Sequence, residues 1–178
     1  MFGLAPFLGQ VREGCGFFAP NAPYSCAGAP HGRQWFDIQQ GESGAMSASE
    51  DLQELLLSIF EEFSLHPSNV ILGGFSQGGM MTLAVGPVFD LAGLISFSGA
   101  LLTEKNLKRA NNSSPPILLI HGDLDDVVPV SALIDAQSYL EEKGYAVEVV
   151  LEKGLGHSID AKGLDSARKF IDEHLPKE

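Results

Sequence analysis

Short apolar runs without polar alternation restrict the fold of this chain more than any other feature. Residues 69–74 (NVILGG), 93–98 (GLISFS) and 116–121 (PILLIH) are of this kind, and residues 146–151 are expected to add a last strand. A strand exposed on one face alternates apolar and polar residues, so a continuous apolar centre indicates a strand covered on both faces. Such strands belong to a mostly parallel sheet between layers of helices.

Segments with helical periodicity separate these strands. Leucine, isoleucine and phenylalanine recur at intervals of three and four after Ser47, whose spacing from a following glutamate predicts a capping box at the start of a helix that ends before Pro67. Further helices are expected over residues 131–143 and 160–175. The alternation predicts an α/β fold, a three-layer αβα sandwich formed by residues 1–178 as a single domain.

The first part of the chain departs from this regular alternation. Residues 15–19 form a short apolar run that predicts another strand, and the stretch 20–32, rich in Pro and Gly, predicts a long loop without regular structure. The polar residues 103–114 predict a surface excursion between two buried strands.

Composition excludes several classes of protein. A chain with 44% hydrophobic and 19% charged residues can bury a core, which argues against wholesale disorder. The net charge of −12 repels phosphate, so we expect no nucleic-acid partner. The N-terminus has no basic region, and no apolar run approaches the roughly 18 residues of a membrane span, so no membrane insertion is expected. Two cysteines without a CxxC motif predict a cytoplasmic protein with reduced thiols and no metal site.

A serine lies between two glycines where the strand 69–74 is followed by a helix. Gly74-Phe75-Ser76-Gln77-Gly78 matches Gly-x-Ser-x-Gly, the nucleophile elbow, in which a strained strand-to-helix turn exposes the serine hydroxyl. We expect glycine at both outer positions because a side chain at either would crowd the adjacent backbone. Ser76 is therefore the candidate nucleophile.

A serine nucleophile needs a base, and the chain has five histidines. His31, His66 and His174 are expected at the surface, and His121 is expected to make a local hydrogen bond at the end of a buried strand. His157 lies between the last predicted strand and the last predicted helix, where α/β hydrolases carry their catalytic histidine. His157 is therefore the preferred base.

The base in turn needs a carboxylate that fixes its tautomer. Asp123, Asp125 and Asp126 all lie in the turn after the strand 116–121. The spacing Gly-x-x-Asp-x-x-Val-Pro selects Asp125, and the other two are expected to brace the turn. The chain order Ser76, Asp125, His157 is that of α/β hydrolases.

These motifs carry a resemblance to a known family. The sequence GFSQGG, the Trp-Phe-Asp at the end of the Pro- and Gly-rich stretch and the Asp125 turn resemble the phospholipase/carboxylesterase family, which includes acyl-protein thioesterases and small bacterial carboxylesterases. The resemblance implies an α/β-hydrolase fold, no cofactor, and hydrolysis of carboxylic esters or thioesters. It makes Ser76 the nucleophile, His157 the base, Asp125 the orienting carboxylate, and the Gln77 backbone N–H an oxyanion donor.

The resemblance also concerns the substrate. Trp35 and Leu101 match positions near the substrate cleft of the family, although core packing explains each residue equally well. The implied partner is a small-molecule ester or acylated substrate, and relatives are monomers or homodimers.

One expected element is missing from the sequence. Relatives carry a His-Gly-x-Gly loop that supplies a second oxyanion N–H, and this chain contains no replacement, which predicts an N-terminally truncated fold. The missing strand would lie between the strands 15–19 and 69–74, leaving edges that pair with each other, with residues 1–10 or with a second chain. The alternative to an esterase is a catalytically silent domain that binds an acyl ligand or a protein partner.

Overall fold

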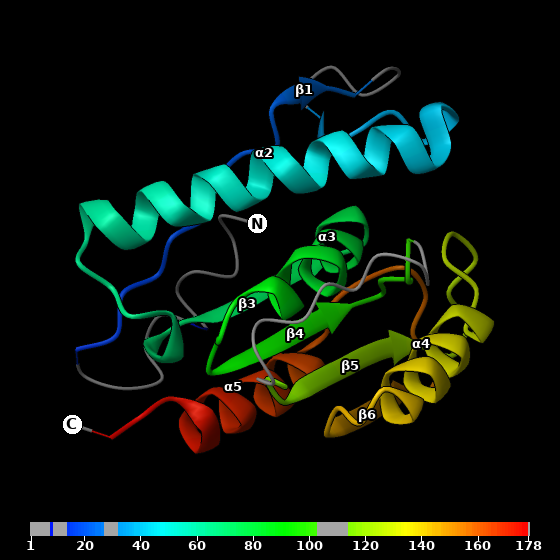
Figure 1. Ribbon diagram of the computed structural model, residues 1–178. Helices are drawn as coiled ribbons and strands as arrows, with labels where there is room; N and C mark the ends of the chain where they lie inside the picture. Colours follow the sequence, from blue (N-terminus) through cyan, green and yellow to red (C-terminus); the bar gives the residue numbers. More distant parts are fainter. Residues whose placement is uncertain (1–7, 9–13, 27–31, 103–113, 178) are drawn as a thin grey trace.

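A parallel sheet of four strands organises the computed structural model, which describes residues 8, 14–26, 32–102 and 114–177 (Figure 1). The strands are β3 (Ile71–Phe75), β4 (Gly93–Phe97), β5 (Ile117–Gly122) and β6 (Val147–Glu152). They lie side by side in chain order, and each pairs with the next in parallel. The predicted α/β fold with a mostly parallel sheet is confirmed.

Helices cover both faces of this sheet. One apolar cluster joins β5 to α2 (Gly41–Glu62), α3 (Gln77–Val85) and α4 (Ser131–Glu142), and a second joins it to α5 (Ala161–His174). In Figure 1, α2 lies over α3 on one side of the sheet and α5 lies on the other.

The two clusters explain the continuous apolar sequence of β5. Ile117 and Leu119 point into the first cluster, whereas Leu118 and Ile120 point into the second. Since successive side chains of a strand point to opposite faces, a strand between two helical layers has no face exposed to solvent and is mostly apolar.

The helix expected to begin at Ser47 begins six residues earlier, at Gly41. A short 3₁₀ helix, Ile38–Gln40, leads into it, and the Asp37 side chain accepts a hydrogen bond from the Gln39 N–H at its start. The prediction of a helix start at Ser47 was wrong, because the serine and glutamate spacing of a capping box also occurs inside helices.

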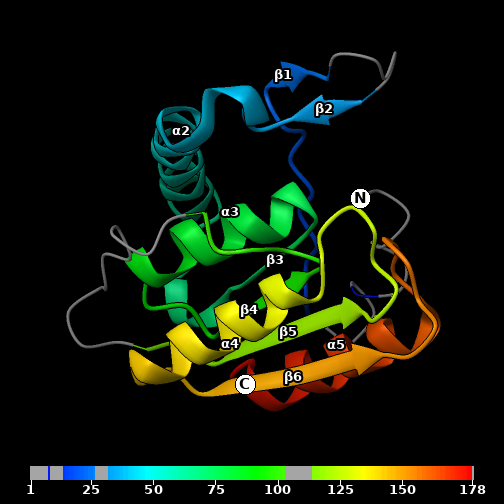
Figure 2. The same cartoon turned by 90° about the vertical axis from the view of Figure 1, so that its right-hand side faces the viewer.

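The predictions for the first part of the chain were wrong in two respects. Residues 15–19 form no strand, and none of the described strands pairs with them, so a short apolar run was not sufficient for pairing. The stretch after it contributes to a two-residue antiparallel ladder between β1 (Tyr24–Ser25) and β2 (Arg33–Gln34), seen beside one end of α2 in Figure 2.

Two predictions concern residues outside the described part of the chain. Residues 103–113 hold nearly all of the predicted polar excursion, and residues 1–7 and 9–13 hold most of the segment expected to pair with an open strand edge. Within the described residues, no helix has the length and apolar character needed to cross a membrane.

Candidate active site

Ser76 occupies a sharp turn between β3 and α3. Its backbone has φ 55° and ψ −121°, a conformation that residues other than glycine rarely adopt. The Ser76 N–H donates to the carbonyl of Phe97 at 2.8 Å, and its own carbonyl accepts from the Met80 N–H at 3.0 Å. These bonds attach the strained turn to β4 and to the first turn of α3.

The two glycines beside Ser76 do not have the same role. A Cβ at Gly74 would overlap the backbone of Gly78 and lie 2.7 Å from the Gly79 nitrogen, so only glycine fits there. A Cβ at Gly78 would meet no atom within 4 Å. The expectation of crowding at both positions is correct for Gly74 and wrong for Gly78.

Asp125 lies in the turn of residues 122–129, called here the acid turn, which follows β5. The Asp125 side chain is buried, and its Oδ1 accepts hydrogen bonds from the backbone N–H groups of Val127, at 3.0 Å, and Val128, at 2.8 Å. Backbone donors within the turn therefore fix the position of the carboxylate. Its Oδ2 is left to face His157.

Burial and hydrogen bonding act on the pKa of Asp125 in opposite directions. Burial raises the pKa because it penalises the charged form. Hydrogen bonds to the carboxylate outweigh burial and lower the pKa to about 2; the donors are the His157 ring, the Ser98 hydroxyl and the backbone N–H groups of Val128 and Val127. Asp125 is accordingly a fixed negative charge at neutral pH.

His157 connects the carboxylate to the serine. Its Nδ1 lies 2.8 Å from Asp125 Oδ2, and its Nε2 lies 2.9 Å from Ser76 Oγ. An ionised carboxylate can only accept a hydrogen bond, so Nδ1 carries the proton of the neutral ring and Nε2 is free to accept the proton of the serine hydroxyl. The Phe75 ring packs against the imidazole with centroids 4.8 Å apart.

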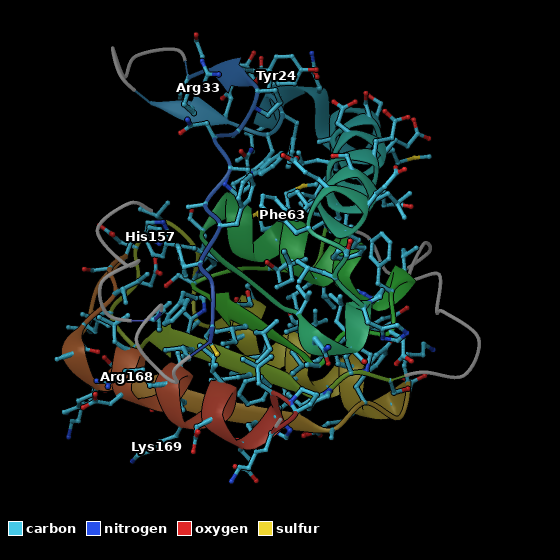
Figure 3. All side chains as sticks on the ribbon, turned by 90° about the vertical axis from the view of Figure 1, so that its left-hand side faces the viewer. Tyr24, Arg33, Phe63, His157, Arg168 and Lys169 are labelled. Carbon is cyan, nitrogen blue, oxygen red and sulfur yellow. The ribbon has the colours of Figure 1, made fainter. Side chains whose placement is uncertain are left out.

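The acid turn is also bonded to the loop that carries His157. Asp123 Oδ1 accepts from the Gly154 N–H at 2.6 Å, and the Leu124 N–H donates to the Leu155 carbonyl at 3.0 Å. Figure 3 shows His157 between α5, below it in that view, and the β1–β2 ladder with Tyr24 and Arg33, above it. The predicted bracing role holds for Asp123, whose carboxylate accepts the bond from Gly154, whereas Asp126 is exposed.

His121 is buried at the end of β5 and bonds locally, as predicted. Its Nε2 donates to the Val128 carbonyl at 2.8 Å and lies 3.5 Å from Asp125 Oδ2. Of the other histidines, His66 is exposed and His174 is half-buried near Glu148, while His31 lies outside the described residues.

Sequence reasoning missed Ser98, which directly follows β4. Its side chain is buried, its backbone has φ 47°, and its hydroxyl is hydrogen-bonded to Asp125. The sequence did carry a signal, because Ser98 lies at the carboxyl end of a buried strand. Ser76 and Asp125 were expected at the same edge of the sheet.

The remaining predicted site residues are Gln77, Trp35 and Leu101. Gln77 begins α3, where backbone N–H groups have no partner within the helix, so its N–H can donate to an anion. Trp35 and Leu101 are half-buried and pack against the larger apolar cluster. Their contact with a substrate stays a prediction.

Three side chains in the described part of the chain are grouped closely enough to approach one cation. Glu148, Glu173 and His174 have ligand atoms within 4.8 Å of one another. They lie near the start of β6 and the end of α5, whereas His157 follows the end of β6. This group is separate from the serine, histidine and aspartate cluster.

The fold and the cluster together define a class of protein. A parallel sheet with a serine on a strained turn into a helix, and with an aspartate and a histidine after two later strands, is the arrangement of the α/β hydrolases.

Comparisons with known proteins narrow this class. Residues 8–175 match the model of the phospholipase/carboxylesterase family. The chain is 34% identical over 173 residues to a rice (Oryza sativa subsp. japonica) protein named "Probable carboxylesterase", with 88% of this chain covered. It is 33% identical over 182 residues to acyl-protein thioesterase 1 of Neurospora crassa, with 90% of this chain covered. This chain belongs to the phospholipase/carboxylesterase family.

Solved structures agree with this assignment. The crystal structure of esterase PE8 has a TM-score of 0.80 and 39% identity, and the match covers 88% of this chain and 77% of that one. The Arabidopsis thaliana carboxylesterase SOBER1 has a TM-score of 0.83 and 26% identity, covering 98% of this chain and 92% of that one. The chain spans 64% of the length of the rice relative and 74% of the length of the Neurospora relative.

Proposed function

We propose that this protein hydrolyses carboxylic esters or thioesters through Ser76, His157 and Asp125. The observation that carries the proposal is the unbroken chain of hydrogen bonds from Asp125 Oδ2 to His157 Nδ1, 2.8 Å, and from His157 Nε2 to Ser76 Oγ, 2.9 Å. Membership of a family whose named members are carboxylesterases and acyl-protein thioesterases supports the same reaction class.

The first half of the reaction forms an acyl-enzyme. Ser76 Oγ attacks the carbonyl carbon of the substrate while its proton passes to His157 Nε2. Asp125 stabilises the resulting imidazolium, and the Gln77 N–H donates to the negative oxygen of the tetrahedral intermediate. The intermediate collapses, the bond to the alcohol or thiol breaks, and the leaving group takes the proton from His157.

The second half restores the serine. A water molecule gives a proton to His157 Nε2 and attacks the acyl carbon, and a second tetrahedral intermediate forms. When it collapses, Ser76 Oγ leaves and recovers the proton from His157. The carboxylic acid product departs, and Asp125 keeps its charge throughout.

The proposed substrate is a small-molecule ester or an acylated molecule, with Trp35 and Leu101 next to its acyl group. Both residues are half-buried apolar side chains at the border of the core, which suits contact with a hydrocarbon chain. The cytoplasmic location, the absence of a nucleic-acid partner and the choice between monomer and homodimer remain predictions from composition and resemblance.

A fluorophosphonate probe tests the proposal, because it phosphonylates only an activated serine. We expect one covalent adduct, located at Ser76 by peptide mass spectrometry, together with hydrolysis of p-nitrophenyl acyl esters. Ser76→Ala should abolish both while the circular dichroism spectrum stays unchanged. Ser58→Ala, which changes an exposed serine of α2, is the matched control and should keep both.

Two outcomes would contradict the proposal. Labelling at another serine would reassign the nucleophile. A folded protein that neither reacts with the probe nor hydrolyses any ester of the series would support the alternative, a catalytically silent domain that binds an acyl ligand or a protein partner.

A further inference from the structure

Gln77 has a second set of contacts that the proposed reaction does not use. Its backbone begins α3 beside Ser76, but its side-chain amide reaches across to residues 35–37, called here the Trp35 segment. Oε1 accepts a hydrogen bond from the Trp35 N–H at 2.7 Å, and Nε2 donates to the Phe36 carbonyl at 2.9 Å. One amide thus satisfies the donor of one residue and the acceptor of the next.

The two hydrogen bonds to Trp35 and Phe36 together require an amide side chain. The amide presents one acceptor and donors at the same end of the side chain, in the way that a backbone group of a neighbouring strand would. Glutamate keeps an acceptor for the Trp35 N–H but places a second oxygen against the Phe36 carbonyl. Methionine has nearly the same length and makes neither bond.

The bonds of the Gln77 side chain link a turn that is fixed by other contacts to a segment without regular secondary structure. Ser76 and the start of α3 are fixed independently by backbone bonds to Phe97 and Met80. The Trp35 segment lies outside any helix or strand, between β2 and the 3₁₀ helix that precedes α2. The Phe36 side chain is buried and anchors the segment to the core, so the bonds from Gln77 decide how the backbone at Trp35 is oriented.

We propose that the Gln77 side chain is a positioning residue. It holds Trp35 in place beside the strained turn at Ser76, called here the nucleophile turn, and thereby sets the binding of the acyl group. The proposal rests on the proposed ester hydrolysis. It assigns two separate tasks to one residue, since the backbone N–H of Gln77 serves the oxyanion and its amide serves the substrate wall.

Tryptophan fluorescence tests the contact without any reference to catalysis. Trp35 is the only tryptophan in the chain, so the emission and its quenching by acrylamide report on this segment alone. We expect Gln77→Met to raise the quenching constant of the folded protein about twofold, as loss of two hydrogen bonds frees the segment. Gln137→Met is the matched control, because it removes a glutamine hydrogen bond to Glu141 on the surface of α4.

Kinetics then test the positioning role. For a p-nitrophenyl octanoate substrate we expect Gln77→Met to raise KM about tenfold, the equivalent of losing one or two net hydrogen bonds. For the acetate ester, KM should rise much less than for the octanoate ester, because a two-carbon acyl group offers little surface to the Trp35 side chain. Gln77→Glu should raise KM in the same direction, whereas Gln137→Met should change neither constant.

The outcomes separate this inference from the proposed function. Unchanged quenching in a folded Gln77→Met variant would overturn the contact, and raised quenching with unchanged KM would overturn its role in substrate binding.

If the native protein shows no hydrolysis and no probe labelling, the proposed function fails, and the fluorescence result still decides the contact. If Gln77→Met does not fold, hydrogen exchange in the native protein decides instead: a slowly exchanging Trp35 N–H supports the bond, and a rapidly exchanging one overturns it.

Discussion

The acid turn and the Trp35 segment both lie close to the nucleophile turn, but they are held in different ways. The acid turn is fixed by several buried hydrogen bonds, including those from two of its own backbone N–H groups to Asp125. The Trp35 segment is joined to the nucleophile turn through the side chain of one residue, Gln77. The part of the site that carries charge is thus held by several hydrogen bonds, whereas the Trp35 segment is joined to the nucleophile turn by two hydrogen bonds from one side chain.

This difference has a physical basis. A buried carboxylate loses much of its hydration, so each missing hydrogen bond would cost a large free energy and a dense set of donors is required. The apolar contact proposed for Trp35 and an acyl chain would depend on shape alone, and such a contact can adjust when a single hydrogen bond is lost. We therefore expect changes in the acid turn to have much larger effects than changes in the first part of the chain.

The largest expected effect is on catalysis. Asp125→Asn should lower kcat about 10⁴-fold, because an amide nitrogen facing His157 favours the wrong tautomer. Asp126→Asn, an adjacent exposed residue, is the control and should keep kcat within about twofold. Ester hydrolysis at saturating substrate measures both. Equal losses in the two variants would mean that the turn acts through its net charge and not through Asp125.

The second-largest expected effect is on the free energy of unfolding and comes from the packing of the acid turn. A Cβ at Gly122 would overlap the Leu155 carbonyl and lie 2.7 Å from the Gly156 carbonyl oxygen, so Gly122→Ala must displace the loop that carries His157. We expect a loss of about 2–4 kcal/mol in the free energy of unfolding and a lower kcat. Gly16→Ala is the control from the first part of the chain, where a Cβ would meet no atom within 4 Å. Urea unfolding compares them, and a stable Gly122→Ala variant would refute the tight packing of the acid turn.

A smaller effect concerns pH. The pKa of Asp125 in the folded protein is about 2, against an ordinary value of 3.8, so its contribution to stability is fully present above pH 4 and is lost as pH falls through 2. The shift corresponds to about 2 kcal/mol. The difference in unfolding free energy between the native protein and Asp125→Asn should therefore shrink between pH 4 and pH 2. A difference that stays constant over this window would contradict the lowered pKa.

The smallest effect is expected in the first part of the chain. Arg33, a residue of the β1–β2 ladder, donates from Nε to the Ala22 carbonyl at 2.8 Å in an exposed position. Because water competes for both groups, Arg33→Ala should change the free energy of unfolding by less than about 1 kcal/mol and leave kcat unchanged. A larger loss in thermal unfolding would show that this region is held as firmly as the acid turn.

The same contrast explains what the sequence could predict. Strands β3 to β6 begin and end within two residues of the predicted ranges, because continuous apolar runs bounded by turns leave few alternatives. Ser76, Asp125 and His157 were selected from their places after these strands, and the structure brings them within hydrogen-bond distance. Their catalytic roles await the experiments above.

The predictions that failed had different physical causes. The start of α2 depends on the chain before it, and residues 15–19 have the composition of a strand without a described partner strand. Ser98 has no motif of its own, and its role follows only from the approach of the acid turn to the end of β4. The amide contacts of Gln77 join residues 41 and 42 positions apart, which no local pattern reveals.

The agreement between strand order in the sheet and strand order along the chain has a consequence for synthesis on the ribosome. The serine at the end of β3 and the histidine after β6 are 81 residues apart, so at about 5–20 residues per second roughly 4–16 seconds separate their translation. During that interval the nascent polypeptide can add strands to one growing edge, but the serine has no histidine beside it. The hydrogen-bonded relay can therefore form only after β6 has been translated and added to the sheet.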